Sequence, residues 1–117
     1  MVSIQKLRKL ALSFPEASEE PHFEKSSFRV KKKIFATIDS KSKIACLKLS
    51  PSDQDIFSRI DNTVIYAVPN KWGFQGWTFI HLDKIKSEIF NDVLLAAYCE
   101  VAPKKLAELV RPKINEI

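Results

Sequence analysis

Three short segments between residues 26 and 49 constrain the fold of this chain more than any other feature of its sequence. The segments 26–30, 34–39 and 44–49 carry β-branched and aromatic residues whose side chains alternate between two faces. Their connections, 31–33 and 40–43, are short and polar, as β-hairpins require. The sequence therefore predicts three consecutive strands that pair antiparallel.

Apolar residues at helical spacing predict helices before and after these strands. The predicted helical segments are 3–14, a short helix that begins at Ser50, 87–101 and a terminal turn from Pro103. The start of the second predicted helix is well marked, because Ser50 can cap the helix and Pro51 suits its first turn. Asp53 adds negative charge at the positive end of the helix dipole.

Two further strands are predicted over 63–68 and 77–82, and the acidic segment 15–24 is predicted to be a loop. The predicted order is therefore α-β-β-β-α-β-β-α-α. Sequential hairpins imply a mostly antiparallel sheet with the helices gathered on one side of it. We expect a single α+β domain of two layers over residues 1–117.

Both glycines and both tryptophans of the chain fall within residues 69–77. Glycine serves where φ is positive or where the backbone approaches another segment closely, so this loop is predicted to keep a defined shape. Trp77 begins a predicted strand and is expected to pack in the core. Trp72 and Phe74 are expected to contact a ligand, and for Trp72 the alternative is that it only covers the end of the sheet.

Positive charge is concentrated in the predicted hairpins. Residues 25–48 include eight basic residues and one acidic residue, so this segment carries +7, whereas the whole chain carries +5. The run from Arg29 through Lys31, Lys32 and Lys33 lies at the tip of the first hairpin. Two interpretations stay open: the lysines contact phosphates, or they form a solvated turn that protects the sheet edges from aggregation.

The sequence contains no motif of an enzyme, a metal site or a cofactor site. Cys46 and Cys99 form no CxxC or Cys/His pattern, and we expect both to be reduced and buried. His22 and His81 have no partner at a suitable spacing, and GxxxxGK, GxSxG and HExxH are absent. No apolar segment has the length of a membrane span or of a signal-peptide core. We therefore expect a non-enzymatic, cytoplasmic protein that binds no metal, cofactor or membrane.

Five segments spread over almost the whole chain resemble the MmcQ/YjbR-like family. They are Phe14-Pro15-Glu16, Pro21-His22-Phe23, SFRVKKKIFATID (27–39), Gly76-Trp77-Thr78-Phe79-Ile80 and Tyr98-Cys99-Glu100-Val101-Ala102-Pro103-Lys104-Lys105. The resemblance implies an α-β3-α-β2-α fold similar to type III secretion chaperones, and a predicted DNA-binding protein with a double-wing motif. The first wing would be the hairpin around Lys31, Lys32 and Lys33, and the second the loop 70–76. Family members often carry glycine where this chain has Lys31 and Lys32, so a different hairpin tip is expected here.

These observations together predict weak, largely sequence-independent binding of nucleic acid, with DNA as the expected partner. The residues expected to contact it are Arg29, Lys31, Lys32, Lys33, Lys71, Trp72 and Phe74. One alternative is a protein-interaction or chaperone-like module, with a protein partner or a second copy of the chain on an exposed apolar surface. Another is a small-ligand pocket on a concave sheet.

Strand alternation adds a further hypothesis. It places Trp77, Phe79 and His81 on one face of their strand, and Phe35 and Thr37 on one face of theirs. If these faces lie on the open side of the sheet, they would form an aromatic and basic platform of the kind that binds single strands. The basic residues expected beside it are Arg29 and Lys48.

Overall fold

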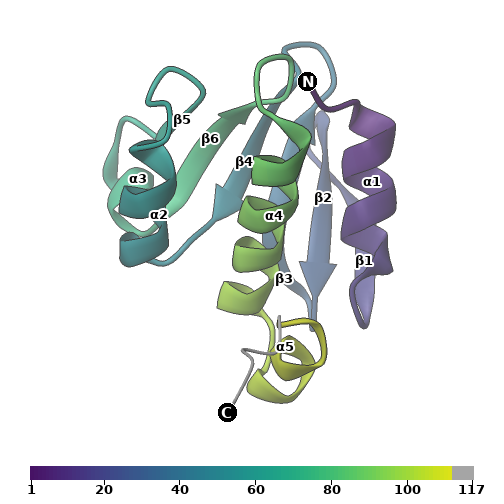
Figure 1. The fold of residues 1–117 in the computed structure, drawn as a ribbon. Helices are drawn as coiled ribbons and strands as arrows, with labels where there is room; N and C mark the ends of the chain where they lie inside the picture. The colour runs from purple at the N-terminus through teal and green to yellow at the C-terminus, as the bar shows by residue number, and fades with distance from the viewer. Residues whose placement is uncertain (112–117) are drawn as a thin grey trace.

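Six strands form one antiparallel sheet, and the helices α1, α2 and α4 lie across one face of it (Figure 1). The structure, a computed structural model, describes residues 1–111. The strands are β1 (Ala17–His22), β2 (Lys25–Val30), β3 (Lys33–Asp39), β4 (Ile44–Lys48), β5 (Ile65–Ala67) and β6 (Trp77–His81). The helices are α1 (Ile4–Ser13), α2 (Pro51–Ser58), α3 (Lys71–Phe74), α4 (Ser87–Val101) and α5 (Lys104–Val110).

The predicted α+β architecture of two layers, with an antiparallel sheet, is confirmed. The strands lie side by side in the order β1-β2-β3-β4-β6-β5, so that β6 separates β4 from β5. Ser50 caps α2 as expected, because the Asp53 backbone N–H donates to Ser50 Oγ (3.1 Å). Ser3 caps α1 in the same way and accepts a hydrogen bond from the Lys6 N–H (3.0 Å). No helix within residues 1–111 is long and apolar enough to cross a membrane.

The segment 15–24 is not a loop, because residues 17–22 form the edge strand β1. This strand pairs only with β2, from Ala17 opposite Val30 to His22 opposite Lys25. Its acidic residues and Pro21 have low strand propensity, which explains the wrong prediction. An edge strand tolerates them, because one side of its backbone has no partner strand. The 69–77 loop likewise contains a short helix, α3, which the sequence did not indicate.

The core lies between the sheet and the helices. A β-bulge places one of its largest side chains, Phe35, on the buried face of the sheet. Phe28 pairs with Ala36 and Arg29 pairs with Ile34, so Phe35 has no opposite partner on β2. The extra residue turns the fully buried Phe35 ring toward the helices, 5.4 Å from the ring of Tyr98. The expectation that Phe35 shares a face with Thr37 is therefore wrong.

Candidate functional site

The face of the sheet opposite the helices is open, and the strands bring side chains together on it in rows. Residues paired across antiparallel strands share a face. One row crosses β3, β4, β6 and β5 at Thr37, Cys46, Phe79 and Tyr66, all of them partly exposed. The predicted common face of Trp77, Phe79 and His81 is confirmed, and it is the open one.

A hollow on this face, which we call the open-face groove, has a volume of about 410 Å³. Trp77, Phe79 and Cys46 come from β6 and β4, whereas Trp72 comes from α3 and is 50% exposed. The full lining is His22, Lys25, Ile34, Thr37, Cys46, Val68, Trp72, Trp77 and Phe79. The groove therefore combines aromatic rings with few charges.

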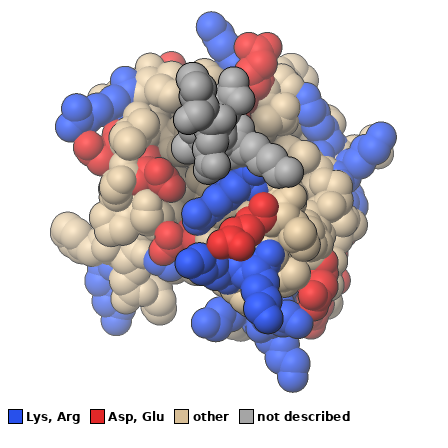
Figure 2. All heavy atoms as spheres, turned by 60° about the horizontal axis from the view of Figure 1, so that its bottom comes forward, with Lys and Arg blue, Asp and Glu red and all other residues tan. Residues whose placement is uncertain are grey.

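A second hollow of about 490 Å³, which we call the basic hollow, lies next to the open-face groove. Figure 2 brings the end of the molecule with the β2–β3 turn forward and shows Lys and Arg side chains gathered there, with some acidic ones among them. The lining residues are Arg29, Lys32, Lys33, Ile34, Lys48, Trp77, Glu100 and Val101. Ile34 and Trp77 also line the open-face groove, so the two hollows adjoin.

Two cations of the basic hollow are held in place by polar neighbours. Arg29 Nε donates to Ser27 Oγ (3.0 Å), and the buried Ser27 hydroxyl donates to the Glu20 carbonyl (2.9 Å). Lys48 Nζ donates to the backbone carbonyl of Gln75. Side chains fixed in this way lose less rotamer entropy when a ligand binds.

The β2–β3 turn keeps a left-handed backbone although it consists of two lysines. Lys31 has φ of 50° and Lys32 has φ of 69°, between the paired residues Val30 and Lys33. Two-residue hairpins favour such turns because their twist matches that of the strands. The expectation of a different tip is therefore wrong, and the lysines occupy positions that glycine would adopt at lower cost.

The predicted first wing is only partly assembled in the basic hollow. Arg29, Lys32 and Lys33 line it together, whereas Lys31 Nζ lies 2.7 Å from Glu16 Oε1 and does not line it. Both members of this pair are half exposed, so its contribution to stability is small.

The predicted second wing contributes Trp72 to the open-face groove, but not Lys71 or Phe74. The Lys71 ammonium lies 5.7 Å from the centre of the Trp72 ring, in a cation–π contact. The Phe74 side chain is 89% exposed. Neither of these two side chains lines either hollow.

Both glycines allow close backbone approaches that hold α3 against the sheet, which confirms the defined shape predicted for this loop. A Cβ at Gly73 would lie 2.0 Å from the Val68 carbonyl oxygen, and one at Gly76, where φ is +105°, would lie 1.8 Å from that of Leu49. Gln54 Nε2 on α2 donates to the Gly73 carbonyl at 3.0 Å. These contacts fix the wall of the open-face groove that carries Trp72.

Trp77 was expected in the core, and this expectation is wrong. Its ring is half-buried on the open face, where it lines both hollows. The alternation of Trp77, Phe79 and His81 was the signal that could have placed it there. Lys48, one of the basic residues expected beside the platform, joins Arg29 in the basic hollow.

The Cys46 thiol forms part of the floor of the open-face groove. Burial raises the pKa of this thiol to about 11, and the positive charge of Lys25 opposes the shift. The group is therefore a neutral thiol near pH 7, with low nucleophilicity. Cys46 and Cys99 are both free and partly exposed, so the expectation that they are buried is wrong.

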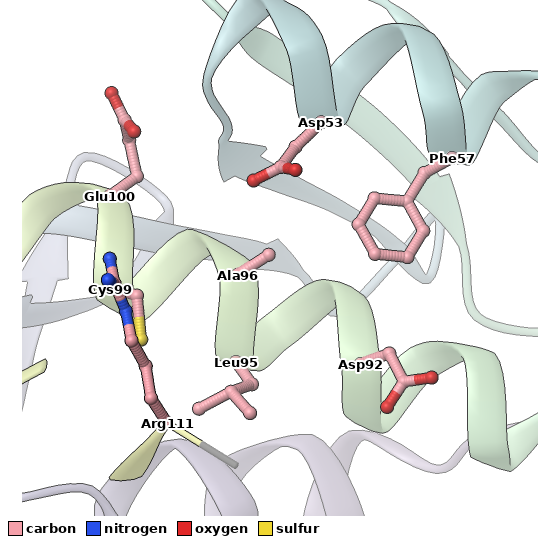
Figure 3. A pocket seen from close by; sticks show the side chains of 8 residues that line it. All are labelled: Asp53, Phe57, Asp92, Leu95, Ala96, Cys99, Glu100 and Arg111. Atoms are coloured by element: carbon pink, nitrogen blue, oxygen red, sulfur yellow. The ribbon is translucent and has the colours of Figure 1, made fainter. Parts of the chain in front are cut away.

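A third hollow lies between α2 and α4, on the side of the molecule that carries the helices, and has a volume of about 510 Å³. It shares Glu100 with the basic hollow. Figure 3 shows Asp53 and Phe57 projecting from α2, with Asp92, Leu95 and Ala96 on α4 below them. Cys99, Glu100 and Arg111 complete the lining. Three carboxylates surround an apolar floor, so this α2–α4 groove disfavours phosphate.

A family model for YjbR matches residues 12–100. No curated protein matches the chain. Among solved structures, it is similar to the crystal structure of the Deinococcus radiodurans protein DR2400, which contains a DUF419 domain, with a TM-score of 0.77. The two are 22% identical, and the match covers 99% of this chain and 94% of that one. At this identity the likeness shows the fold alone.

Proposed function

The chain belongs to the YjbR family, and we propose that it binds nucleic acid, weakly and largely independently of sequence, through the open-face groove and the basic hollow. The observation that carries this proposal is the position of Trp77 and Ile34, which line both hollows. A bound strand would therefore meet cations and aromatic rings on one continuous surface. This combination is typical of surfaces that bind nucleic acids without reading base edges.

The charges set the expected strength and salt dependence of binding. The basic hollow has four cations, Arg29, Lys32, Lys33 and Lys48, and one acidic residue, Glu100. Each phosphate contact on a single strand contributes about 0.7 to the slope of log affinity against log salt concentration. With four contacts we expect a slope of about −3.

Fluorescence anisotropy of labelled DNA at several salt concentrations tests this proposal. The variant with Lys32, Lys33 and Lys48 replaced by alanine should bind much more weakly and with a shallower slope. A matched control removes three exposed lysines outside both hollows: Lys9, Lys41 and Lys84. Equal losses in the two variants would refute a localised site, and absence of binding at low salt would refute the proposal.

A second candidate function is a protein-interaction module that uses the α2–α4 groove. Its apolar floor of Phe57 and Leu95 and its carboxylates Asp53, Asp92 and Glu100 complement a basic, amphipathic peptide. Peptide binding there should be lost on Leu95→Asp and should survive loss of the three lysines of the basic hollow. Peptide binding that depends on those lysines instead would contradict this candidate.

A further inference from the structure

We infer that the nucleic acid bound on the open face is single-stranded, with unstacked bases against Trp72, Trp77 and Phe79 and with phosphates on the basic hollow. This inference rests on the proposed function and names its substrate class. It follows from three features: the depth of the aromatic rings, their spacing, and the state of the two predicted wings.

All three aromatic rings line the same hollow, the open-face groove. Trp77 and Phe79 are half-buried on the sheet, and Trp72 faces the same groove from α3. Bases of a duplex are covered by their neighbours and their pairing partners, so their faces cannot reach such rings. Only bases that have left the stack can enter the groove.

The spacing of the rings along β6 also excludes a stacked strand. Trp77 and Phe79 are two residues apart, which places them about 7 Å apart along the strand. Consecutive nucleotides in a duplex rise by about 3.4 Å per strand. One base on each ring therefore requires a strand extended to about twice that rise, as in proteins whose sheets hold splayed bases on aromatic residues.

The two predicted wings are poorly arranged to grip a duplex. Lys31 is paired with Glu16, and the exposed Phe74 lines neither hollow. Gln54 Nε2 anchors helix α3 to the sheet, because it donates both to the Gly73 carbonyl in α3 (3.0 Å) and to Thr78 Oγ1 in β6 (3.0 Å). Trp72 is thus presented from a rigid support, which suits a preformed stacking platform.

Tryptophan fluorescence can test this inference, because of where the two tryptophans lie. Both tryptophans of the chain line the open-face groove, so intrinsic fluorescence reports directly on its occupancy. The probes are an oligothymidylate of about twelve nucleotides, within the usual range of single-strand sites, and a duplex of the same length. We expect tighter binding of the oligothymidylate at low salt, accompanied by quenching of the tryptophan fluorescence.

Trp72→Ala is the test variant, because Trp72 is half exposed and its loss leaves the core intact. Affinity for the oligothymidylate should fall about five-fold or more, and affinity for the duplex should change little. Phe74→Ala is the matched control, since this exposed ring lies outside the groove. Its affinities should match those of the unmodified protein.

The outcomes separate this inference from the proposed function. Tighter binding of the duplex, or an oligothymidylate affinity unaffected by Trp72→Ala, would overturn the inference. The proposed function would still stand if binding remained dependent on salt and on Lys32, Lys33 and Lys48. Absence of binding to either probe at low salt would overturn both.

Discussion

Replacing Lys32 with glycine should stabilise the fold while weakening binding. Lys32 has φ of 69°, a left-handed conformation that costs an L-residue about 1–2 kcal/mol and costs glycine almost nothing. Glycine also gives the unfolded chain more freedom, which offsets roughly 0.4–1 kcal/mol of this gain. The net expectation is a stabilisation of about 0.5–1 kcal/mol, or an increase in Tm of about 2–4 °C for a chain of this length.

Urea and thermal unfolding followed by circular dichroism measure this effect. Lys33→Gly is the matched control, because it removes the same charge from a strand residue without positive φ. Glycine at position 33 should destabilise the fold by about 0.5–1 kcal/mol. Both variants should lower the affinity for nucleic acid, and the salt slope should become shallower by about 0.7. If Lys32→Gly destabilises as much as Lys33→Gly does, the argument from the left-handed turn is refuted.

Three other predictions concern buried contacts. Gly76→Ala should destabilise the fold by about 3 kcal/mol or more, because of its φ of +105° and the Leu49 carbonyl 1.8 Å from the new Cβ; urea unfolding that matches the unmodified protein would contradict this. Tyr98→Phe should cost about 1–2 kcal/mol in the same assay, since it removes the 2.6 Å bond from Tyr98 Oη to the Pro15 carbonyl. The pKa of Cys46 is raised to about 11 from an ordinary 9.0, which predicts slow alkylation of the thiol at pH 8. It also predicts that the fold loses stability as the pH rises above about 9, because the thiol loses its proton at lower pH in the unfolded chain than in the folded one. Cys46→Ser should reduce this loss without abolishing it, because burial also raises the pKa of Tyr98, and a pH profile unchanged by that substitution would count against the assignment.

Much of the local structure could be predicted from the sequence, because it depends on neighbours within a few residues. The caps at Ser3 and Ser50 and the alternation along the strands are of this kind. The positions of Gly73 and Gly76 also indicated a loop of defined shape, which the structure explains by two close backbone approaches. The lysine run indicated the cationic hairpin tip.

The candidate site could be predicted only in part, because it depends on contacts between distant segments. Arg29 lies in β2 and Lys48 in β4. Both strands pair antiparallel with β3, so their C-terminal ends, which carry these two residues, lie at the same edge of the sheet. Lys31 does not line the basic hollow and instead forms an ion pair with Glu16, which belongs to a segment predicted as a loop. Periodicity within a strand contains no information on such pairings.

The sequence by itself therefore determined the four longer helical segments and the hairpins after residue 25, but not the edge strand β1 or the short helix α3. It also determined which side chains share a face along strands without a bulge. Only the tertiary structure decided which face the helices cover, and hence that Trp77 lines a groove although its pattern also suits a core position. The bulge at Phe35 shows the same limit, since one unpaired residue reverses the side on which a ring lies. The physical reason is that alternation defines two equivalent faces, and only the packing of the helices makes them different.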